Sequence, residues 1–386
     1  MTSLASAVEP PAADADLQAP PELGPRLAGA LFWVAVAFST FQVVTAAFSP
    51  LSSSVVRAVH VGFLLLVTFV LYPPLARRPL GWVIGALGFA AGLYHWVFEA
   101  QLVQRAGEMT PADMVVGTIT IVLVFEAARR IMGLALPIIC GCFLLYGLFG
   151  QYLPGALGHR GYGLDQIVGQ LGFGTEGIYG TPVYVSSSYI FLFILFGAFL
   201  EQAGMITLFT DVALGLFGHA KGGPAKVAVV SSGLMGTING SGVANVVTVG
   251  QFTIPLMKRF GYEPAFAGGV EATSSMGGQI MPPVMGAVAF IMAETINVPY
   301  VEICKAAAIP AVLYFLTAFV MVHLEAGRSG LLGMPKDQCP SAWGALRERW
   351  FLILPLAVLV WLLFAGYTPL FSGMMGLALT VVLIFG

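Results

Sequence analysis

Long stretches of the chain contain no Asp, Glu, Lys or Arg and are each about as long as a membrane span. They cover 27–56, 58–76, 79–98, 131–159, 177–200, 227–257, 272–293, 306–324 and 350–386. A helix needs about 20 apolar residues to cross the hydrocarbon core, where lipid offers no partner for free backbone polar groups. With the shorter segment 114–125, these stretches predict an all-α polytopic membrane protein with about ten transmembrane segments.

Composition excludes several other classes. Charged residues make up only 9% of the 386 residues, against roughly a quarter in soluble domains. The net charge of -2 and the absence of a basic stripe exclude nucleic-acid binding. Four cysteines (Cys140, Cys142, Cys304 and Cys339) form neither a disulfide framework nor a zinc pattern. The five histidines are scattered and no catalytic motif is found, so we expect no enzyme activity and no cofactor other than a coupling ion.

The N-terminal 25 residues differ from the rest. They are acidic and rich in proline, and they lack both the basic start and the early apolar core of a signal peptide. We therefore expect a disordered tail over 1–25. Basic residues in short loops indicate a cytoplasmic N-terminus; they are Arg26, Arg77, Arg78, Arg129, Arg130, Lys258 and Arg259, with Arg57 as the exception.

The uncharged stretch 227–257 has basic residues on both sides, Lys221 and Lys226 before it and Lys258 and Arg259 after it. If both flanks are cytoplasmic, the stretch cannot cross the membrane once. Its centre, 235–245, is rich in glycine and small polar residues, which disfavour a helix. The pattern predicts a re-entrant helical hairpin whose tip lies inside the membrane, where protein or a cavity must surround it.

The next apolar segment is interrupted. Residues 264–281 have a helical pattern, and Pro282 and Pro283 then end it because proline lacks a backbone donor and restricts the residue before it. A second piece follows over 284–297. The sequence therefore predicts a proline-broken transmembrane helix.

Broken helices in membranes leave free N–H and C=O groups that bind substrates and coupling ions. Sodium is a hard cation that prefers oxygen ligands. Candidate ligands are Thr237, Asn239, Ser241 and Asn245 at the hairpin tip and Thr273, Ser274, Ser275 and Gln279 in the broken helix. Small polar residues also serve close helix packing, which is the alternative for each of them. Glu271 and Glu294 are candidates for a proton or charge role, so proton coupling stays open.

At these motifs the chain resembles TRAP transporter permeases. The resemblance rests on GGPAKVAVV (222–230), GTINGSGVAN (236–245) and TIPLMKRFGY (253–262). VEATSSMGGQIMPPVMG (270–286) is similar to the TAXI-type branch, in which small and large membrane subunits are fused, and 126–130 and 152–155 fit that form. The resemblance covers about 27–386.

The resemblance implies a bacterial inner-membrane secondary transporter of the ion transporter superfamily with an elevator mechanism. It implies ion-coupled uptake, with Na+ as the ion, of an organic acid such as a dicarboxylate or glutamate-like compound handed over by a periplasmic TAXI-type binding protein. A four-helix small-subunit-like domain would cover 26–131 and the large-subunit-like transport and scaffold domain 132–386. The family's first ion site carries over onto Ser241, Gly242 and Asn245 and onto a segment containing Ser274, Ser275, Gly278, Pro282 and Pro283, with Na+ near Ser241, Asn245 and Ser275.

The chain departs from the family pattern in one respect. After residue 300 the sequence has no second glycine-rich hairpin and no second paired-proline break, and residues 381–386 lie in an apolar run. We therefore expect a sequence truncated after the first inverted repeat, half of an elevator-type transporter. A channel or structural membrane subunit is the remaining alternative. The sequence identifies neither the solute nor the oligomeric state.

Overall fold

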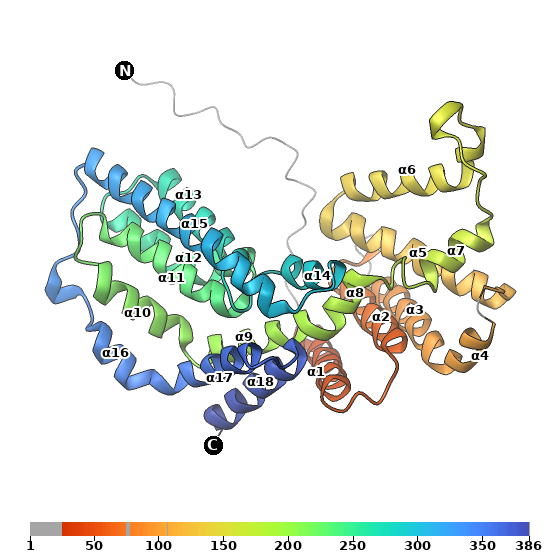
Figure 1. Cartoon of the computed structure of the whole chain (residues 1–386), viewed down its shortest axis with the longest axis horizontal. Coiled ribbons are helices and arrows are strands. Elements are labelled where there is room, and N and C mark those ends of the chain that lie inside the picture. Colours follow the sequence, from red (N-terminus) through yellow and green to blue (C-terminus); the bar gives the residue numbers. More distant parts are fainter. Residues whose placement is uncertain (1–24, 75–77, 106, 386) are drawn as a thin grey trace. The chain divides into compact units, whose positions relative to one another are not determined.

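The computed structural model describes residues 25–74, 78–105 and 107–385, and every regular element in these ranges is a helix (Figure 1). The predicted tail over 1–25 lies outside them, except for Pro25. The chain divides into two compact units, Met1–Tyr184 and Val185–Gly386. The all-α prediction is confirmed for the described residues.

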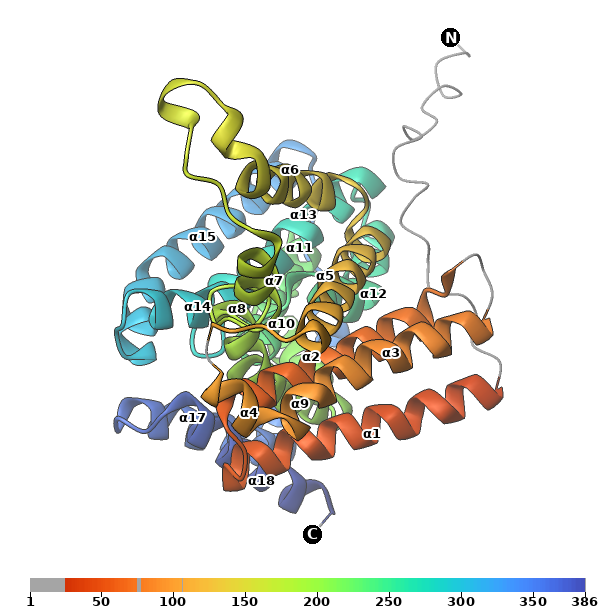
Figure 2. The ribbon, with the colours of Figure 1, turned by 90° about the vertical axis from the view of Figure 1, so that its right-hand side faces the viewer.

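Within the described ranges, the first unit contains five long apolar α-helices (α1, α2, α3, α5 and α6) and three short ones. They are α1 (Pro25–Phe48), α2 (Ser53–Leu71), α3 (Arg78–Val97), α4 (Glu99–Gln104), α5 (Pro111–Met132), α6 (Ala135–Phe149), α7 (Leu164–Gly172) and α8 (Thr181–Val185). α2 and α3 pack side by side (Figure 2), and a Cβ atom on Gly85 would lie 3.0 Å from the Leu66 carbonyl oxygen. Small residues at such crossings let membrane helices approach closely. The segment 154–185 is rich in glycine, which favours a loop, yet it contains the helix α7.

The second unit is built around the hairpin. Its helices are α9 (Phe191–Gln202), α10 (Met205–Phe217), α11 (Gly223–Asn239), α12 (Gly242–Arg259), α13 (Pro264–Gly277), α14 (Ala287–Thr295), α15 (Tyr300–Arg328), α16 (Ala342–Arg349), α17 (Ile353–Phe364) and α18 (Pro369–Phe385). α11 packs against α10, α12, α13 and α15. Ala225, Ala228 and Val229 of α11 therefore lie in the buried core of this unit.

Seven helical segments in the described part of the chain are long and apolar enough to cross a membrane. They are Leu27–Phe48, Ser53–Leu71, Arg78–Val97, Pro111–Met132, Ala135–Tyr152, Thr181–Gln202 and Tyr300–Arg328. α10 and α18 are apolar but shorter. The prediction of a polytopic membrane protein is confirmed. The hairpin, the broken helix and the stretch 350–386 are not among these seven segments, and their place in the membrane stays a prediction.

The division after Tyr184 reflects packing density. The predicted boundary between 26–131 and 132–386 marks something else, the place where a small-subunit-like domain would join a large-subunit-like domain. That boundary stays a prediction.

Candidate functional site

The predicted hairpin is present as two antiparallel helices, α11 and α12, joined by Gly240 and Ser241. Gly240 has φ +59°, a left-handed conformation that glycine adopts without strain. Ser241 then caps α12, since its hydroxyl accepts a hydrogen bond from the Ala244 amide at 3.3 Å. The glycine and serine of the sequence motif therefore form the tip.

The predicted break in the following helix is also present. α13 ends at Gly277 and a 3₁₀ turn, Gly278–Ile280, follows it. Residues 281–286, which include both prolines, are not helical, and α14 begins at Ala287. The Pro283 and Val284 carbonyls accept hydrogen bonds from the Tyr300 hydroxyl at 2.9 and 2.6 Å. A side chain of α15 thus holds backbone that has lost its helical partners.

The hairpin tip and the helix break are in direct contact. A Cβ atom on Gly236 would collide with the Gly278 backbone, and one on Gly240 would collide with the Met285 carbonyl oxygen. A Cβ atom on Gly242 would lie 2.9 Å from Nε2 of Gln279. Because glycine has no side chain, these positions bring the two irregular backbones together.

Asn245 occupies the buried space behind this contact. Its side chain is fully buried, and its Nδ2 donates to the Ser232 carbonyl at 2.9 Å. Its Oδ1 is buried without a hydrogen-bond partner. A Cβ atom on Gly278 would lie 3.4 Å from Nδ2, so the amide lies beside the start of the 3₁₀ turn. A buried unpaired carbonyl oxygen is costly, and a cation is one partner that would satisfy it.

Other predicted residues already have partners. Ser274 and Thr237 donate to carbonyls of their own helices at 2.7 and 2.6 Å. Ser275 donates to Oε1 of Glu271 at 2.8 Å, and the exposed Thr273 contributes its carbonyl to Tyr314. A hydroxyl that donates a hydrogen bond keeps lone pairs, so these contacts leave cation binding possible. The hydrogen bond of the Ser275 hydroxyl goes to Glu271 rather than to the tip residues Gly240 and Ser241. A Na+ ion near Ser241, Asn245 and Ser275 therefore stays a prediction.

The two candidate carboxylates have different environments. Glu294 is exposed, and its Oε1 accepts a hydrogen bond from Tyr189 at 2.8 Å. Glu271 belongs to α13 and is completely buried where this helix packs against α11 and α12. Its Oε1 accepts from Ser232 at 2.9 Å as well as from Ser275, and its Oε2 contacts the Thr253 hydroxyl. The carboxylate therefore links both arms of the hairpin to the broken helix.

Sequence reasoning missed three of the residues in these contacts. Ser232 and Thr253 were not recognised as partners of Glu271, although Asn245, Val249 and Thr253 recur at four-residue spacing on one buried face of α12. Glu201 of α9 was also missed: its Oε1 accepts from Nδ2 of Asn239 at 3.0 Å, next to the tip. An acidic residue at the end of an apolar helix was the available signal for Glu201.

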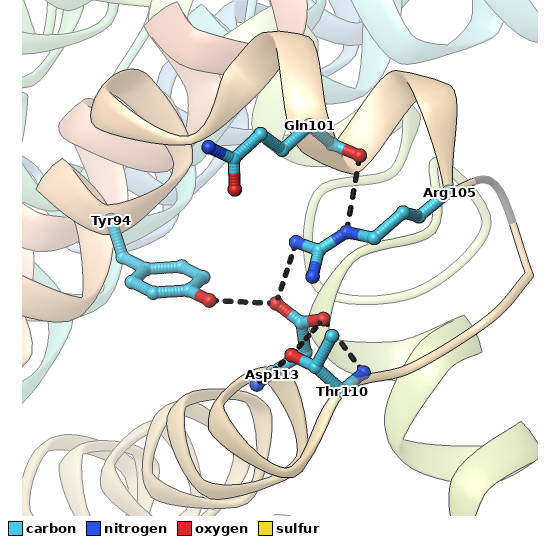
Figure 3. A network of polar contacts seen from close by, with 5 residues as sticks. All are labelled: Tyr94, Gln101, Arg105, Thr110 and Asp113. Atoms are coloured by element: carbon cyan, nitrogen blue, oxygen red, sulfur yellow. Dashed lines mark hydrogen bonds and ion pairs between the residues drawn. The ribbon is translucent and has the colours of Figure 1, made fainter.

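A separate polar network lies in the first unit (Figure 3). Thr110 and Asp113 form a capping box at the start of α5, in which Oδ2 of Asp113 accepts from the Thr110 amide at 2.9 Å. Oδ1 of Asp113 accepts from the Tyr94 hydroxyl at 2.7 Å and lies 3.5 Å from Arg105. All polar atoms of this carboxylate are satisfied, so the network fixes the end of α3, the following short helix and α5 together.

Comparison with known proteins identifies the family. The sequence profile of the tripartite ATP-independent periplasmic transporter, DctM component, matches residues 119–386, which is more than half of the chain. The C4-dicarboxylate TRAP transporter large permease protein DctM of Pseudomonas aeruginosa is 30% identical over 178 residues, 46% of this chain and 41% of that protein. The sialic acid TRAP transporter large permease protein SiaM of Vibrio cholerae is 27% identical over 178 residues, again 46% and 41%.

A longer match is found with the uncharacterized protein y4mL of Sinorhizobium fredii, which is 25% identical over 257 residues, 65% of this chain and 56% of that protein. The chain thus spans about two fifths to somewhat over half of the length of these relatives. The TAXI-type fusion and the truncation stay predictions. The chain belongs to the DctM component family of tripartite ATP-independent periplasmic transporters, which are transporters rather than enzymes.

Proposed function

We propose that this chain is the membrane component of an ion-coupled secondary transporter, and that the hairpin tip and the helix break form its coupling-ion site. The observation that carries the proposal is the direct contact between the end of α11 with the hairpin tip, Gly236–Ser241, and the helix break, Gly278–Gly286, beside a buried asparagine oxygen without a partner. Transporters bind ions and substrates at such interrupted helices.

The proposed ion is Na+. Oδ1 of Asn245 is the first ligand, because it is a buried oxygen that lacks a partner and its amide lies beside the helix break. Free carbonyls of the helix break and the hydroxyls of Ser241 and Ser275 are the other ligands, in keeping with the preference of hard cations for oxygen. No carboxylate is needed in this shell for a monovalent ion. Proton coupling through the buried Glu271 is the competing version.

The proposed substrate is an organic acid delivered by a periplasmic binding protein, which we propose to be of the TAXI type. Support comes from the relatives, whose names specify a C4-dicarboxylate and sialic acid, both of which carry carboxylates. The free N–H groups at the start of α14 would favour such an anion. We further propose a fused small and large subunit, an N-terminus in the cytoplasm and elevator movement of the hairpin with its broken helix.

The test is uptake into proteoliposomes that contain the full gene product, with the binding protein and radiolabelled candidate dicarboxylates outside. We expect uptake that requires an inward Na+ gradient and that is abolished by Ser241→Ala and by Asn245→Ala. Gln251→Ala is the matched control, because this exposed amide lies on the same helix away from the tip. Uptake unchanged in both tip variants would refute the site assignment.

Two further arms separate the alternatives. Uptake driven by a proton gradient without Na+ would favour the proton-coupled version. Solute flux that needs no gradient and carries uncoupled current would indicate a channel. Neither result is expected from the proposed mechanism.

A further inference from the structure

A groove of about 810 Å³ lies in the first unit, lined by residues of α5, α6 and α7 and of the segments next to α7. Its volume is within the roughly 300–1,000 Å³ of typical small-molecule sites. The groove has two chemically different ends, and nothing in the proposed ion site uses it.

One end is apolar. Phe125 of α5 and Cys140, Phe143 and Leu144 of α6 line it, and a Cβ atom on Gly141 would lie 4.0 Å from the Phe125 ring. Side chains of α6 outside the groove are also exposed and apolar. Such a surface suits hydrocarbon rather than water.

The other end is polar. It is lined by Arg160 and Tyr162 of the segment that follows α6 and by Gln166 and Gln170 of α7, with the apolar Ile167 and Leu171 beside them. Gly147 lies at this end, since a Cβ atom on it would contact Ile167 of α7 at 3.5 Å. With a helical rise of about 1.5 Å per residue, Cys140 and Gly147 are separated by roughly 10 Å along α6. The groove is therefore long enough to have a distinct head and tail.

Arg160 is the charged group at the polar end. Its guanidinium lies 5.7 Å from the centre of the Tyr162 ring. Among the described residues it forms no ion pair with a carboxylate. Arginine offers five N–H donors in a planar fork that fits phosphate oxygens, and stacking on a ring leaves these donors available.

We propose that this groove binds a membrane phospholipid, with the headgroup phosphate on Arg160 and an acyl chain between α5 and α6. A phospholipid supplies both of the chemistries that the groove presents, an anion at one end and hydrocarbon at the other. A transmembrane helix of a partner protein would fill the apolar end but would leave the exposed Arg160 at the other end without an anion.

The test uses the purified full chain in detergent and measures phosphatidylglycerol binding by native mass spectrometry. We expect one tightly retained phosphatidylglycerol, with its Kd raised about tenfold by Arg160→Gln, the effect of losing one charge-assisted hydrogen bond. Leu144→Trp, which fills the apolar end, should abolish the tight site. Arg347→Gln, which changes an exposed arginine in the second unit, should leave it unchanged.

Three results would overturn the proposal. The first is an equal Kd for the wild-type protein and both groove variants, provided that their melting temperatures show them folded. The second is equally tight retention of diacylglycerol, which lacks the phosphate. The third is binding of inorganic phosphate alone at Arg160 that does not compete with phosphatidylglycerol, which would place the lipid elsewhere.

Discussion

The buried Glu271 provides a quantitative test of how the hairpin is held against the broken helix. Glu271→Ala removes the acceptor of three hydroxyl contacts at a fully buried position. Thr253 keeps an alternative acceptor, the Val249 carbonyl at 3.1 Å, whereas Ser232 and Ser275 lose their carboxylate. A buried donor left unsatisfied costs about 1–3 kcal/mol, so the two serines together predict a loss of about 2–6 kcal/mol.

Glu271→Gln is the matched control because the amide has the same shape. Its oxygen can accept from Ser232 and Ser275, and its amino group can donate to the Thr253 hydroxyl, which then donates to the Val249 carbonyl. The expected loss is below about 1 kcal/mol, since every hydrogen bond survives. The assay is reversible unfolding of the purified chain in mixed micelles under increasing denaturant. If the alanine variant is as stable as the wild type, or if the glutamine variant loses as much as the alanine variant, the hydrogen-bonding account is refuted.

Two further perturbations follow from close contacts outside this cluster. Gly236→Ala should lower the melting temperature and reduce uptake, because a Cβ atom there collides with the Gly278 backbone. Gly268→Ala is the control: a Cβ atom there meets nothing within 4 Å, so this variant should be neutral or stabilised by up to about 1 kcal/mol. Equal melting temperatures for the two variants would argue against the contact between Gly236 and Gly278. Asp113→Ala should lower the free energy of unfolding by about 1–2 kcal/mol, because the capping box of α5 is lost. The measurement is the shift in unfolding midpoint, and Asp165→Ala, at an exposed position in the first turn of α7, is the control. Equal shifts for the two variants would contradict this prediction.

Much of the architecture could be predicted because membrane helices follow from local composition. The stretch 58–76 contains no charge and forms most of α2, and Gly240 ends α11 at the hairpin tip by adopting a left-handed conformation. The paired prolines end α13 for an equally local reason, the missing backbone donor. α7 does not follow from local composition, because the segment around it is rich in glycine, which favours a loop.

The partners inside the candidate site could be predicted only in part, because they depend on tertiary contacts. Glu271 and Ser275 are four residues apart on one helix, so their contact follows from helical geometry. Ser232 lies 39 residues from Glu271, and their contact depends on how the hairpin packs on α13. The same holds for Glu201 and Asn239, which come from helices that sequence periodicity cannot place side by side.

The central claim is that the hairpin tip and the helix break hold a sodium ion through Asn245. The most direct measurement is equilibrium binding of ²²Na+ to the purified full-length protein, with melting temperatures measured in parallel. We expect saturable binding that weakens at least about tenfold in Asn245→Ala and is retained in Gln251→Ala, as loss of one ligand to a charged group requires. Absence of saturable Na+ binding, or equal binding by the Asn245→Ala and wild-type proteins, would contradict the account.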